Sequence, residues 1–418
     1  MSAWLKSWQK KSNPVGGPSR PSYNKYESIE FMIEVTASKK HFLGIPVAEF
    51  LRDYWQKKPL LIRQAFPNYQ APLAPEDLAG IACEEGVLAR LVKHDRKKDH
   101  YTLETGPFKE TMFPKLGKKD WTLLVQDMDK WDGDVRQLIT AFNFLPRWRV
   151  DDVMISFAAP GGSVGPHVDQ YDVFLLQAQG QRRWEIDNNP NADKSFREKT
   201  ELKLLEKFQA SHVWTLQPGD ILYLPPGVPH HGEAVDACMT FSLGMRAPSH
   251  AELLNEWADG LFERVSEDVR YADKDLTAAK DSGEIDSATC DRVLDIFKQH
   301  VPDSKEAAAL FFGRFVTTYR TAMEIAPPPR MPKPEKVLER LAKGDVLVPH
   351  PFARWAWCKD GREAIVFVQG HSFSTTPSVA SILARAESMD AKRFSDFPVS
   401  ERGLIFELIE RGYLVLQK

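Results

Sequence analysis

The chain has 418 residues, of which 43% are hydrophobic and 11% aromatic, so it can form two or three domains with a sizeable buried core. Its formal net charge of -3 and pI of about 6.4 exclude a global basic field that would attract nucleic acid. The 4 cysteines lie far apart without C-x-x-C pairing, and no apolar run approaches the roughly 20 residues that span a bilayer. This composition argues against a disulfide framework, a structural zinc site and a membrane span, and it predicts a cytoplasmic location.

The N-terminal segment 1–31 is rich in lysine, proline, glycine and serine and lacks the apolar core of a signal peptide. We predict that it is a disordered leader. A transit peptide is the alternative interpretation, and Met32 is an alternative start of the natural chain.

Short helices and strands are predicted in the first part of the chain. Residues 47–55 have the apolar spacing of a helix, residues 60–62 form a short buried strand, and Pro75 opens a second helix. A further helix is expected around Val135 to Phe142.

From residue 153 the sequence becomes rich in strand-like runs that are bounded by glycine and proline. These runs are residues 153–157, 172–177, 183–186, 221–224 and 239–245. Several short strands at this spacing predict a barrel or a sandwich rather than a parallel βαβ sheet.

After Pro248 the pattern changes to helices. Large apolar residues recur every four positions, at Leu253, Trp257, Leu261 and Val265. A buried helical stripe is the simpler interpretation. Asp303–Glu306 has the form of a capping box before an apolar helix, which suits a bundle against the barrel or against a second copy of the chain.

The C-terminal part begins after a proline-rich run at residues 326–334, which predicts a stiff linker. It reads as helix, strand, helix, helix, strand, an order typical of a winged helix. These elements are expected at residues 337–341, 364–368, 379–386, 404–409 and 413–416. It has no dense lysine and arginine stripe, so we favour a structural or substrate-docking role over DNA reading.

Two short motifs carry the candidate chemistry. His167-x-Asp169 is the first, and Gly219-x5-Pro225-x4-His230 has the spacing of a second cupin motif. Alone, H-x-D is a weak signal, but on a strand its two side chains would project from the same face and could share an ion. Two histidines and one carboxylate suit non-haem Fe(II) and leave positions open for a cosubstrate and dioxygen.

Neighbouring residues leave alternatives at two positions. His231 could compete with His230 as a ligand, but only one of them can face inward, and the proline spacing favours His230. Similarly, only one of Arg182 and Arg183 can face inward to pair with the far carboxylate of a two-carboxylate cosubstrate. Ser156 could donate its hydroxyl to the same carboxylate.

Longer segments around these motifs resemble a known family. Residues 151–157, 165–174, 219–230 and 244–248 are similar to the JmjC-domain ribosomal oxygenases, in particular to the bacterial arginine hydroxylases of the sixteenth large-subunit ribosomal protein. The resemblance covers the chain from roughly Phe42 to the C-terminus. It implies an α+β fold, in which a JmjC double-stranded β-helix is followed by a helical dimerisation region and a winged-helix-like domain. The expected boundaries are 1–31, 32–248, 249–325, 326–334 and 335–418.

The resemblance also implies an activity, its cofactors and its site residues. The expected enzyme is an Fe(II)- and 2-oxoglutarate-dependent dioxygenase that hydroxylates the β-carbon of an arginine in a large-subunit ribosomal protein. A homodimer without membrane or direct nucleic-acid binding is expected. The matching positions are His167, Asp169 and His230 for iron, Arg182 and Ser156 for 2-oxoglutarate, and Asp152, Met154 and Tyr171 for the substrate arginine. The chain departs from the family pattern at Gln181 and His231.

Two other functions remain open at this point. One is a JmjC hydroxylase that acts on another residue, such as histidine. The other is a non-enzymatic metal-binding cupin with the winged helix as an adaptor. Arg182 and Ser156 weigh against the second, because a scaffold has no need of a 2-oxoglutarate clamp.

Overall fold

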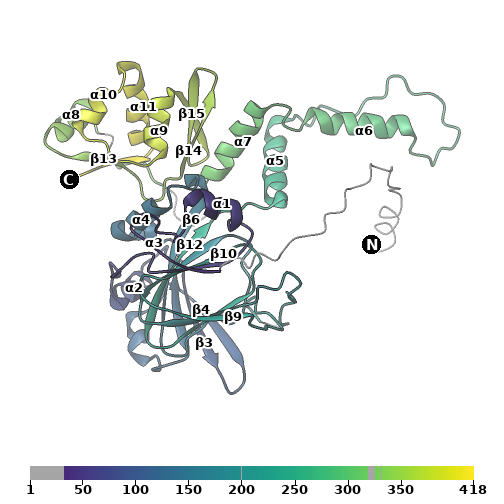
Figure 1. Cartoon of the computed structure of the whole chain (residues 1–418). Coiled ribbons are helices and arrows are strands. Elements are labelled where there is room, and N and C mark those ends of the chain that lie inside the picture. Colours follow the sequence, from purple (N-terminus) through teal and green to yellow (C-terminus); the bar gives the residue numbers. More distant parts are fainter. Residues whose placement is uncertain (1–32, 199, 319–324, 331) are drawn as a thin grey trace. The chain divides into compact units, whose positions relative to one another are not determined.

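A computed structural model describes residues 33–198, 200–318, 325–330 and 332–418. The predicted leader lies outside these residues. Glu34 to Lys418 form one unit, whose helices and strands are labelled in Figure 1. Within the described residues, no helix combines the length and the apolar character needed to cross a membrane.

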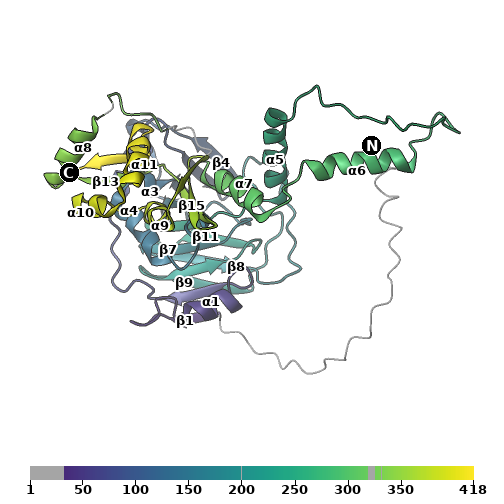
Figure 2. The ribbon, with the colours of Figure 1, turned by 90° about the horizontal axis from the view of Figure 1, so that it is seen from above.

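The N-terminal part is built on two β-sheets. The larger sheet has the strand order β1–β2–β10–β7–β12–β6–β5–β3–β4, and the smaller has the order β11–β8–β9. The strand pairings in these two sheets are antiparallel except that of β1 with β2. Figure 2 shows β8 and β9 side by side. The strands are β1 (Glu34–Thr36), β2 (Leu60–Arg63), β3 (Ala89–Asp95), β4 (His100–Thr105), β5 (Trp121–Val125), β6 (Val150–Ala158), β7 (Val173–Gln179), β8 (Arg182–Ile186), β9 (His212–Leu216), β10 (Ile221–Leu224), β11 (His230–Ala234) and β12 (Cys238–Met245).

Both faces of the central strands β7, β10 and β12 of the larger sheet are buried, which explains their nearly continuous apolar runs. Phe174 of β7 lies in the core that the sheet forms with the preceding helices. Its neighbours Val173 and Leu175 point to the other face and pack with Trp184 of the smaller sheet. The helices are α1 (Val47–Asp53), α2 (Pro75–Ile81), α3 (Met128–Trp131) and α4 (Gly133–Leu138), with 3₁₀ turns η2 (Glu110–Lys115), η3 (Ile139–Phe142) and η4 (Arg147–Arg149).

The prediction of a barrel or sandwich is confirmed, but strands β1, β3, β4, β5, β9 and β11 were not predicted. Strands β3, β4 and β5 extend one edge of the larger sheet, and charged or polar residues interrupt the apolar ones in β3 and β4. The outer pair β3–β4 is partly exposed, so it lacks the apolar runs that mark the central strands.

The middle part contains α5 (His250–Arg264), α6 (Ser287–Gln299) and α7 (Lys305–Thr317). Ser249 caps α5 in a reciprocal capping box with Glu252. The apolar stripe expected on α5 is only half-buried, and no residue of α5 or α6 is fully buried. At α7 the cap is Ser304, whose hydroxyl oxygen accepts from Ala307 N at 3.1 Å, rather than the box expected from Asp303.

The C-terminal part has more strands than its sequence pattern indicated. They are β13 (Val346–Pro349), β14 (Trp355–Asp360), β15 (Glu363–Val368), β16 (His371–Thr375) and β17 (Leu414–Gln417), with helices α8 (Pro334–Ala342), α9 (Pro377–Ala384), α10 (Ala391–Asp396) and α11 (Val399–Glu410). Only β15 and β17 were expected. β15 is the central strand of its sheet and is therefore the most apolar, whereas its partners β14 and β16 have one half-exposed face.

Candidate active site

Three side chains converge at one end of the smaller sheet. Among the described residues, His167, Asp169 and His230 are the group whose potential ligand atoms all lie within 4.8 Å of one another. His230 Nε2 is 3.6 Å from Asp169 Oδ2, and the two imidazole centroids are 4.2 Å apart. Two imidazoles and one carboxylate at this separation fit Fe(II) with open coordination positions.

Both histidines present the same nitrogen to this centre. His167 Nδ1 lies 2.9 Å from Gly165 O, and His230 Nδ1 lies 2.9 Å from Val228 O. A carbonyl oxygen can only accept, so each Nδ1 carries the proton and each Nε2 is free to bind a metal. Burial, aided by the neighbouring His167, lowers the pKa of His230 to about 4, so this imidazole is neutral at physiological pH.

The backbone around the ligands differs from the prediction. His167 is not part of a regular strand. It forms a single bridge in which His167 N donates to His230 O at 3.0 Å and His230 N donates to His167 O at 2.9 Å. Asp169 lies in the following loop, where Gly227 N donates to its carbonyl oxygen at 2.7 Å. Backbone hydrogen bonds between the two motifs therefore bring the ligands together, and a shared strand face does not.

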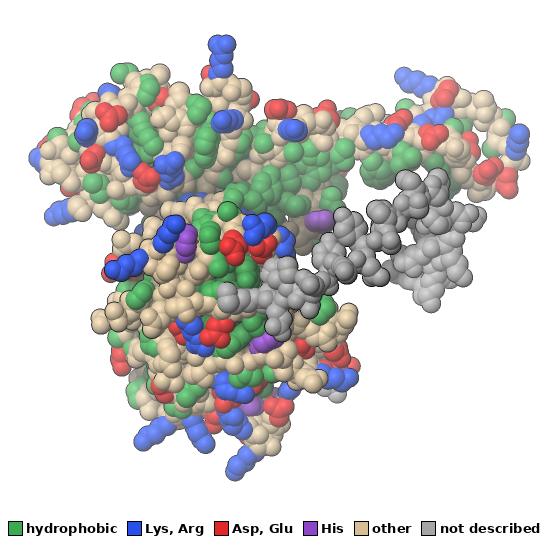
Figure 3. All heavy atoms as spheres, viewed as in Figure 1, with side chains coloured by type: hydrophobic (Ala, Val, Ile, Leu, Met, Phe, Trp, Pro, Cys, Tyr) green, Lys and Arg blue, Asp and Glu red, His purple; other side chains and the backbone are tan. Residues whose placement is uncertain are grey.

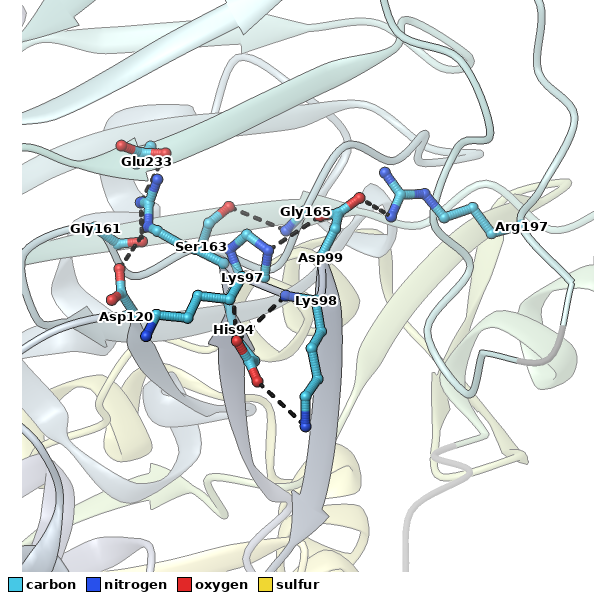
Figure 4. A network of polar contacts seen from close by, with 12 residues as sticks. His94, Lys97, Lys98, Asp99, Asp120, Gly161, Ser163, Gly165, Arg197 and Glu233 are labelled. Atoms are coloured by element: carbon cyan, nitrogen blue, oxygen red, sulfur yellow. Dashed lines mark hydrogen bonds and ion pairs between the residues drawn. The ribbon is translucent and has the colours of Figure 1, made fainter.

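The turn before His167 is attached to neighbouring strands by charged side chains (Figure 4). Gly161 has a φ of +76°, which favours glycine, and its carbonyl oxygen accepts from Arg96 Nη2 at 2.9 Å. Arg96 also donates to Asp120 at 2.6 Å and pairs with Glu233 at 3.0 Å. The arginine thus links the ligand segment to β11 and to the residue that precedes β5.

The two neighbouring arginines differ in burial. Arg182 is 4% exposed, whereas Arg183 points outward and pairs with Glu185. Arg182 Cζ lies 5.8 Å from the ring centroid of Trp184, and the Trp184 ring lies 5.9 Å from that of His230. By the strand register, Arg182, Trp184 and His230 therefore lie on the same face of the smaller sheet.

Two nitrogens of Arg182, Nε and Nη2, are buried and have no hydrogen-bond partner among the described residues. An uncompensated buried cation costs several kcal/mol, so such a group indicates an anionic ligand. The planar fork fits a carboxylate. Ser156 is 3% exposed, and its hydroxyl donates only a long bond of 3.5 Å to Thr240 O, so it is available for a better partner.

Asp152 and Tyr171 border a cavity of about 890 Å³. Asp152 Oδ2 accepts from Asp127 N at 3.1 Å, and burial raises the pKa of Asp152 to about 7. Tyr171 is 42% exposed. Met154 follows Asp152 on the same face of β6, and its sulfur lies 3.9 Å from Arg90 Nη2.

The remaining cavity lining comes from several separate segments. It consists of Gln56, Leu88, Gln126, Asp127, Asp151, Gln170, Pro226, Met245, Arg246, Ala247, Pro248, Ser249, Glu252 and Arg354.

A buried polar network behind Tyr171 was missed in the sequence. Asp172 is fully buried and accepts from the Tyr223 hydroxyl at 2.6 Å, from Arg149 Nη2 at 2.8 Å and from Gln56 Nε2 at 3.0 Å. These bonds fix the residue next to Tyr171. The sequence did contain one indication of this network: the carboxylate of Asp172 comes directly before the apolar run of β7. A charged residue at a buried position requires hydrogen-bonding or ionic partners.

Arg90 is another site residue that sequence reasoning missed. Its register partner on β5 is Leu124, which pairs in turn with Ser156, so all three lie on the face that carries the site. Arg90 Nε is buried without a hydrogen-bond partner within the described part of the chain. Its strand had not been predicted, so its orientation could not be inferred.

Comparisons with known proteins agree with this geometry. Residues 137–253 match the model of a JmjC domain, and residues 298–415 match that of a ROXA-like winged helix. The chain is 37% identical over 300 residues to the ribosomal protein uL16 3-hydroxylase of Escherichia coli (strain K12), covering 72% of this chain and 79% of that protein. It is 40% identical over 228 residues to a probable ribosomal oxygenase of Haemophilus influenzae, covering 54% of this chain and 56% of that protein.

Solved structures give the same result. The E. coli ribosomal oxygenase YcfD in complex with cobalt and 2-oxoglutarate has a TM-score of 0.77 and 32% sequence identity, covering 90% of this chain and 99% of that chain. A further E. coli YcfD structure has a TM-score of 0.79 and 32% identity, covering 89% and 98% of the two chains. The fold, the metal-binding group and these relatives agree. The chain therefore belongs to the ribosomal oxygenases, a family of JmjC-domain, Fe(II)- and 2-oxoglutarate-dependent dioxygenases.

Proposed function

We propose that this chain hydroxylates the β-carbon of an arginine in ribosomal protein uL16. The observation that carries the proposal is the position of the Asp152 carboxylate beside Tyr171, in the wall of a cavity that Gln170, the residue after Asp169, also lines. A carboxylate is the natural partner of a guanidinium, and an aromatic ring can pack against its plane. The name of the E. coli relative supports uL16 as the substrate.

The residues of the site divide into two groups. His167, Asp169 and His230 would hold Fe(II), while Arg182 and Ser156 would bind the far carboxylate of 2-oxoglutarate. Bound there, iron, 2-oxoglutarate and dioxygen supply the oxidation: one oxygen atom enters the substrate C–H bond, and 2-oxoglutarate leaves as succinate and carbon dioxide. The protein would position the iron and 2-oxoglutarate and exclude water from them.

Substrate binding would rest on Asp152, Met154 and Tyr171. The neutral carboxyl of Asp152 ionises when a guanidinium approaches, because an opposite charge favours the charged form. Burial raises the pKa of Tyr171, so its hydroxyl remains a protonated donor at neutral pH. Lysine does not have the planar fork that such a pair of groups recognises.

The helical region supports assembly into a homodimer. Helices α5 and α6 and the segment between them expose large apolar side chains, and Figure 3 shows hydrophobic side chains gathered over α5 and α7 and along α6. The most exposed are Leu254, Phe262, Val269, Leu276, Ile285, Leu294 and Phe297, and Val301, just after α6, is exposed as well. An apolar surface of this extent is typical of an interface.

The remaining parts of the proposal concern domains and location. We infer a catalytic domain over 32–248, a dimerisation region over 249–325, a linker over 326–334 and a winged-helix domain over 335–418. Arg354 lines the cavity and donates to Asp151 O at 2.7 Å, which supports substrate docking by the last domain rather than nucleic-acid binding. A substrate in the large ribosomal subunit suits a cytoplasmic enzyme.

Purified protein with Fe(II) and 2-oxoglutarate should add the mass of one oxygen atom to uL16, with an equal yield of succinate. Fragment mass spectra should place the oxygen on an arginine. Omission of 2-oxoglutarate is the control. An oxygen placed on a histidine would instead support the alternative hydroxylase, and succinate without any modified protein would contradict both.

Substitution of the two adjacent histidines separates their roles. His230→Ala should weaken Co(II) binding by more than about a hundredfold, since loss of even an outer partner of a metal ligand costs about 10- to 100-fold. His231→Ala is the matched control and should bind Co(II) like the wild type, because His231 faces Glu185 at 3.5 Å. Isothermal titration calorimetry checks this, and the reverse pattern would make the assignment wrong.

The rate with arginine substrate should depend on pH through Asp152. Below about pH 7 its carboxyl is protonated and neutral, and above it the carboxylate can pair with the guanidinium. KM for an arginine peptide should therefore fall as pH rises through about 7. Asp152→Asn should raise KM about tenfold or more and abolish this dependence. An unchanged pH profile in the variant would show that another group is responsible.

Light scattering tests the dimer. Phe262 and Phe297 are 84% and 66% exposed, so Phe262→Glu with Phe297→Glu should convert a dimer of the wild type to a monomer by burying charge in the interface. Val399→Glu is the control, since Val399 is 78% exposed on α11. A wild type of monomer mass would contradict the proposal directly.

A further inference from the structure

Gly244 occupies a position in the site that neither motif indicated. It lies in β12, where its register partners are Asp152 on β6 and Val173 on β7. A β-carbon at Gly244 would lie 3.2 Å from Asp152 Oδ1 and 3.9 Å from Tyr171 Cε2. Among the described residues, no other atom outside its chain neighbours lies within 4 Å of that point. The missing side chain therefore borders only the carboxylate and the ring.

Other glycines of the chain have different physical reasons. Gly161 and Gly219 have positive φ values of +76° and +91°, which Gly244 does not share. At Gly232 a β-carbon would lie 2.7 Å from the Trp184 ring, so close packing between strands requires glycine there. Neither the backbone conformation nor packing against a neighbouring strand demands glycine at Gly244. Because Gly244 has no side chain, the space between Asp152 and Tyr171 stays open.

We propose that Gly244 is a specificity-determining residue, whose missing side chain leaves a slot between the Asp152 carboxylate and the Tyr171 ring for the flat guanidinium of the substrate. The inference rests on the proposed arginine hydroxylation and names the feature that selects arginine. A guanidinium is planar and can pair with a carboxylate while its face packs on an aromatic ring. A methyl group at position 244 would fill part of the slot and shield Asp152 Oδ1.

The local backbone keeps this slot in place. The register between β12 and β6 shifts between Gly244 and Met245, which is a β-bulge. Beyond the bulge, Met245 N donates to Asp172 O at 2.9 Å, and the Asp172 side chain is fixed by its buried partners. Bulges re-aim residues beside sites, and here the bulge separates the residue that shapes the slot from the cavity-lining Met245.

Gly244→Ala tests the slot. KM for the arginine peptide should rise roughly tenfold or more, the effect that one methyl group can have in a binding pocket, while kcat changes less. Binding of 2-oxoglutarate to the Co(II)-loaded protein should be unchanged, and this shows that the fold and the cosubstrate site are intact. Gly80→Ala is the matched control, since a β-carbon there meets nothing within 4 Å. An unchanged KM in Gly244→Ala would overturn the proposal.

A measurement on the wild type makes the inference independent of how well the variant folds. A peptide with trimethyllysine in place of the arginine has the same charge but a round head group. Calorimetry should show binding at least about tenfold weaker than that of the arginine peptide. Equal binding of the two peptides would contradict the proposed slot. If the wild type did not hydroxylate the arginine peptide at all, the proposed function itself would be wrong. If it hydroxylated that peptide normally but bound the arginine and trimethyllysine peptides equally well, only the role proposed for Gly244 would be wrong.

Discussion

The site depends on one pair of backbone hydrogen bonds. His167 and His230 each donate an amide hydrogen to the carbonyl oxygen of the other, at 3.0 and 2.9 Å. This bridge joins two motifs that are far apart in sequence and sets the separation of their imidazoles. Each ring is then oriented by a carbonyl oxygen two residues earlier in the chain, at Gly165 and at Val228. The arrangement of the two histidine ligands is thus a consequence of main-chain pairing, and a small shift of either backbone segment would move its imidazole.

Buried charge is the second constraint on this centre. Arg182 and Asp152 both lie on inner surfaces, where an unpaired ion costs several kcal/mol. The protein treats them differently. Arg182 has two nitrogens without partners among the described residues, so it depends on a ligand, while Asp152 has a raised pKa and can remain neutral until a cation arrives. The cost of a buried charge would therefore distinguish the proposed cosubstrate site at Arg182 from the proposed substrate site at Asp152.

Much of the fold was predictable because burial leaves a strong pattern in sequence. Central strands such as β7 are apolar on both faces, and glycine or proline marks their ends, so they could be recognised. The edge pair β3–β4 and strand β14 contain polar or charged residues, so they lack the apolar runs by which the central strands were recognised. Arg90, which lies on β3, was consequently absent from the predicted site.

The sequence by itself determined the donor types and their order: His167, Asp169, then His230, with an inward arginine after the glycine turn. Chemistry of this kind is local, because residue type and spacing carry it. Only the tertiary structure decided that His167 is held by a bridge to His230 and not by a strand, that Arg182 and not Arg183 is buried, and that Gly244 opens a slot beside Asp152. These features depend on which atoms of distant segments meet, and a linear pattern contains no such distances.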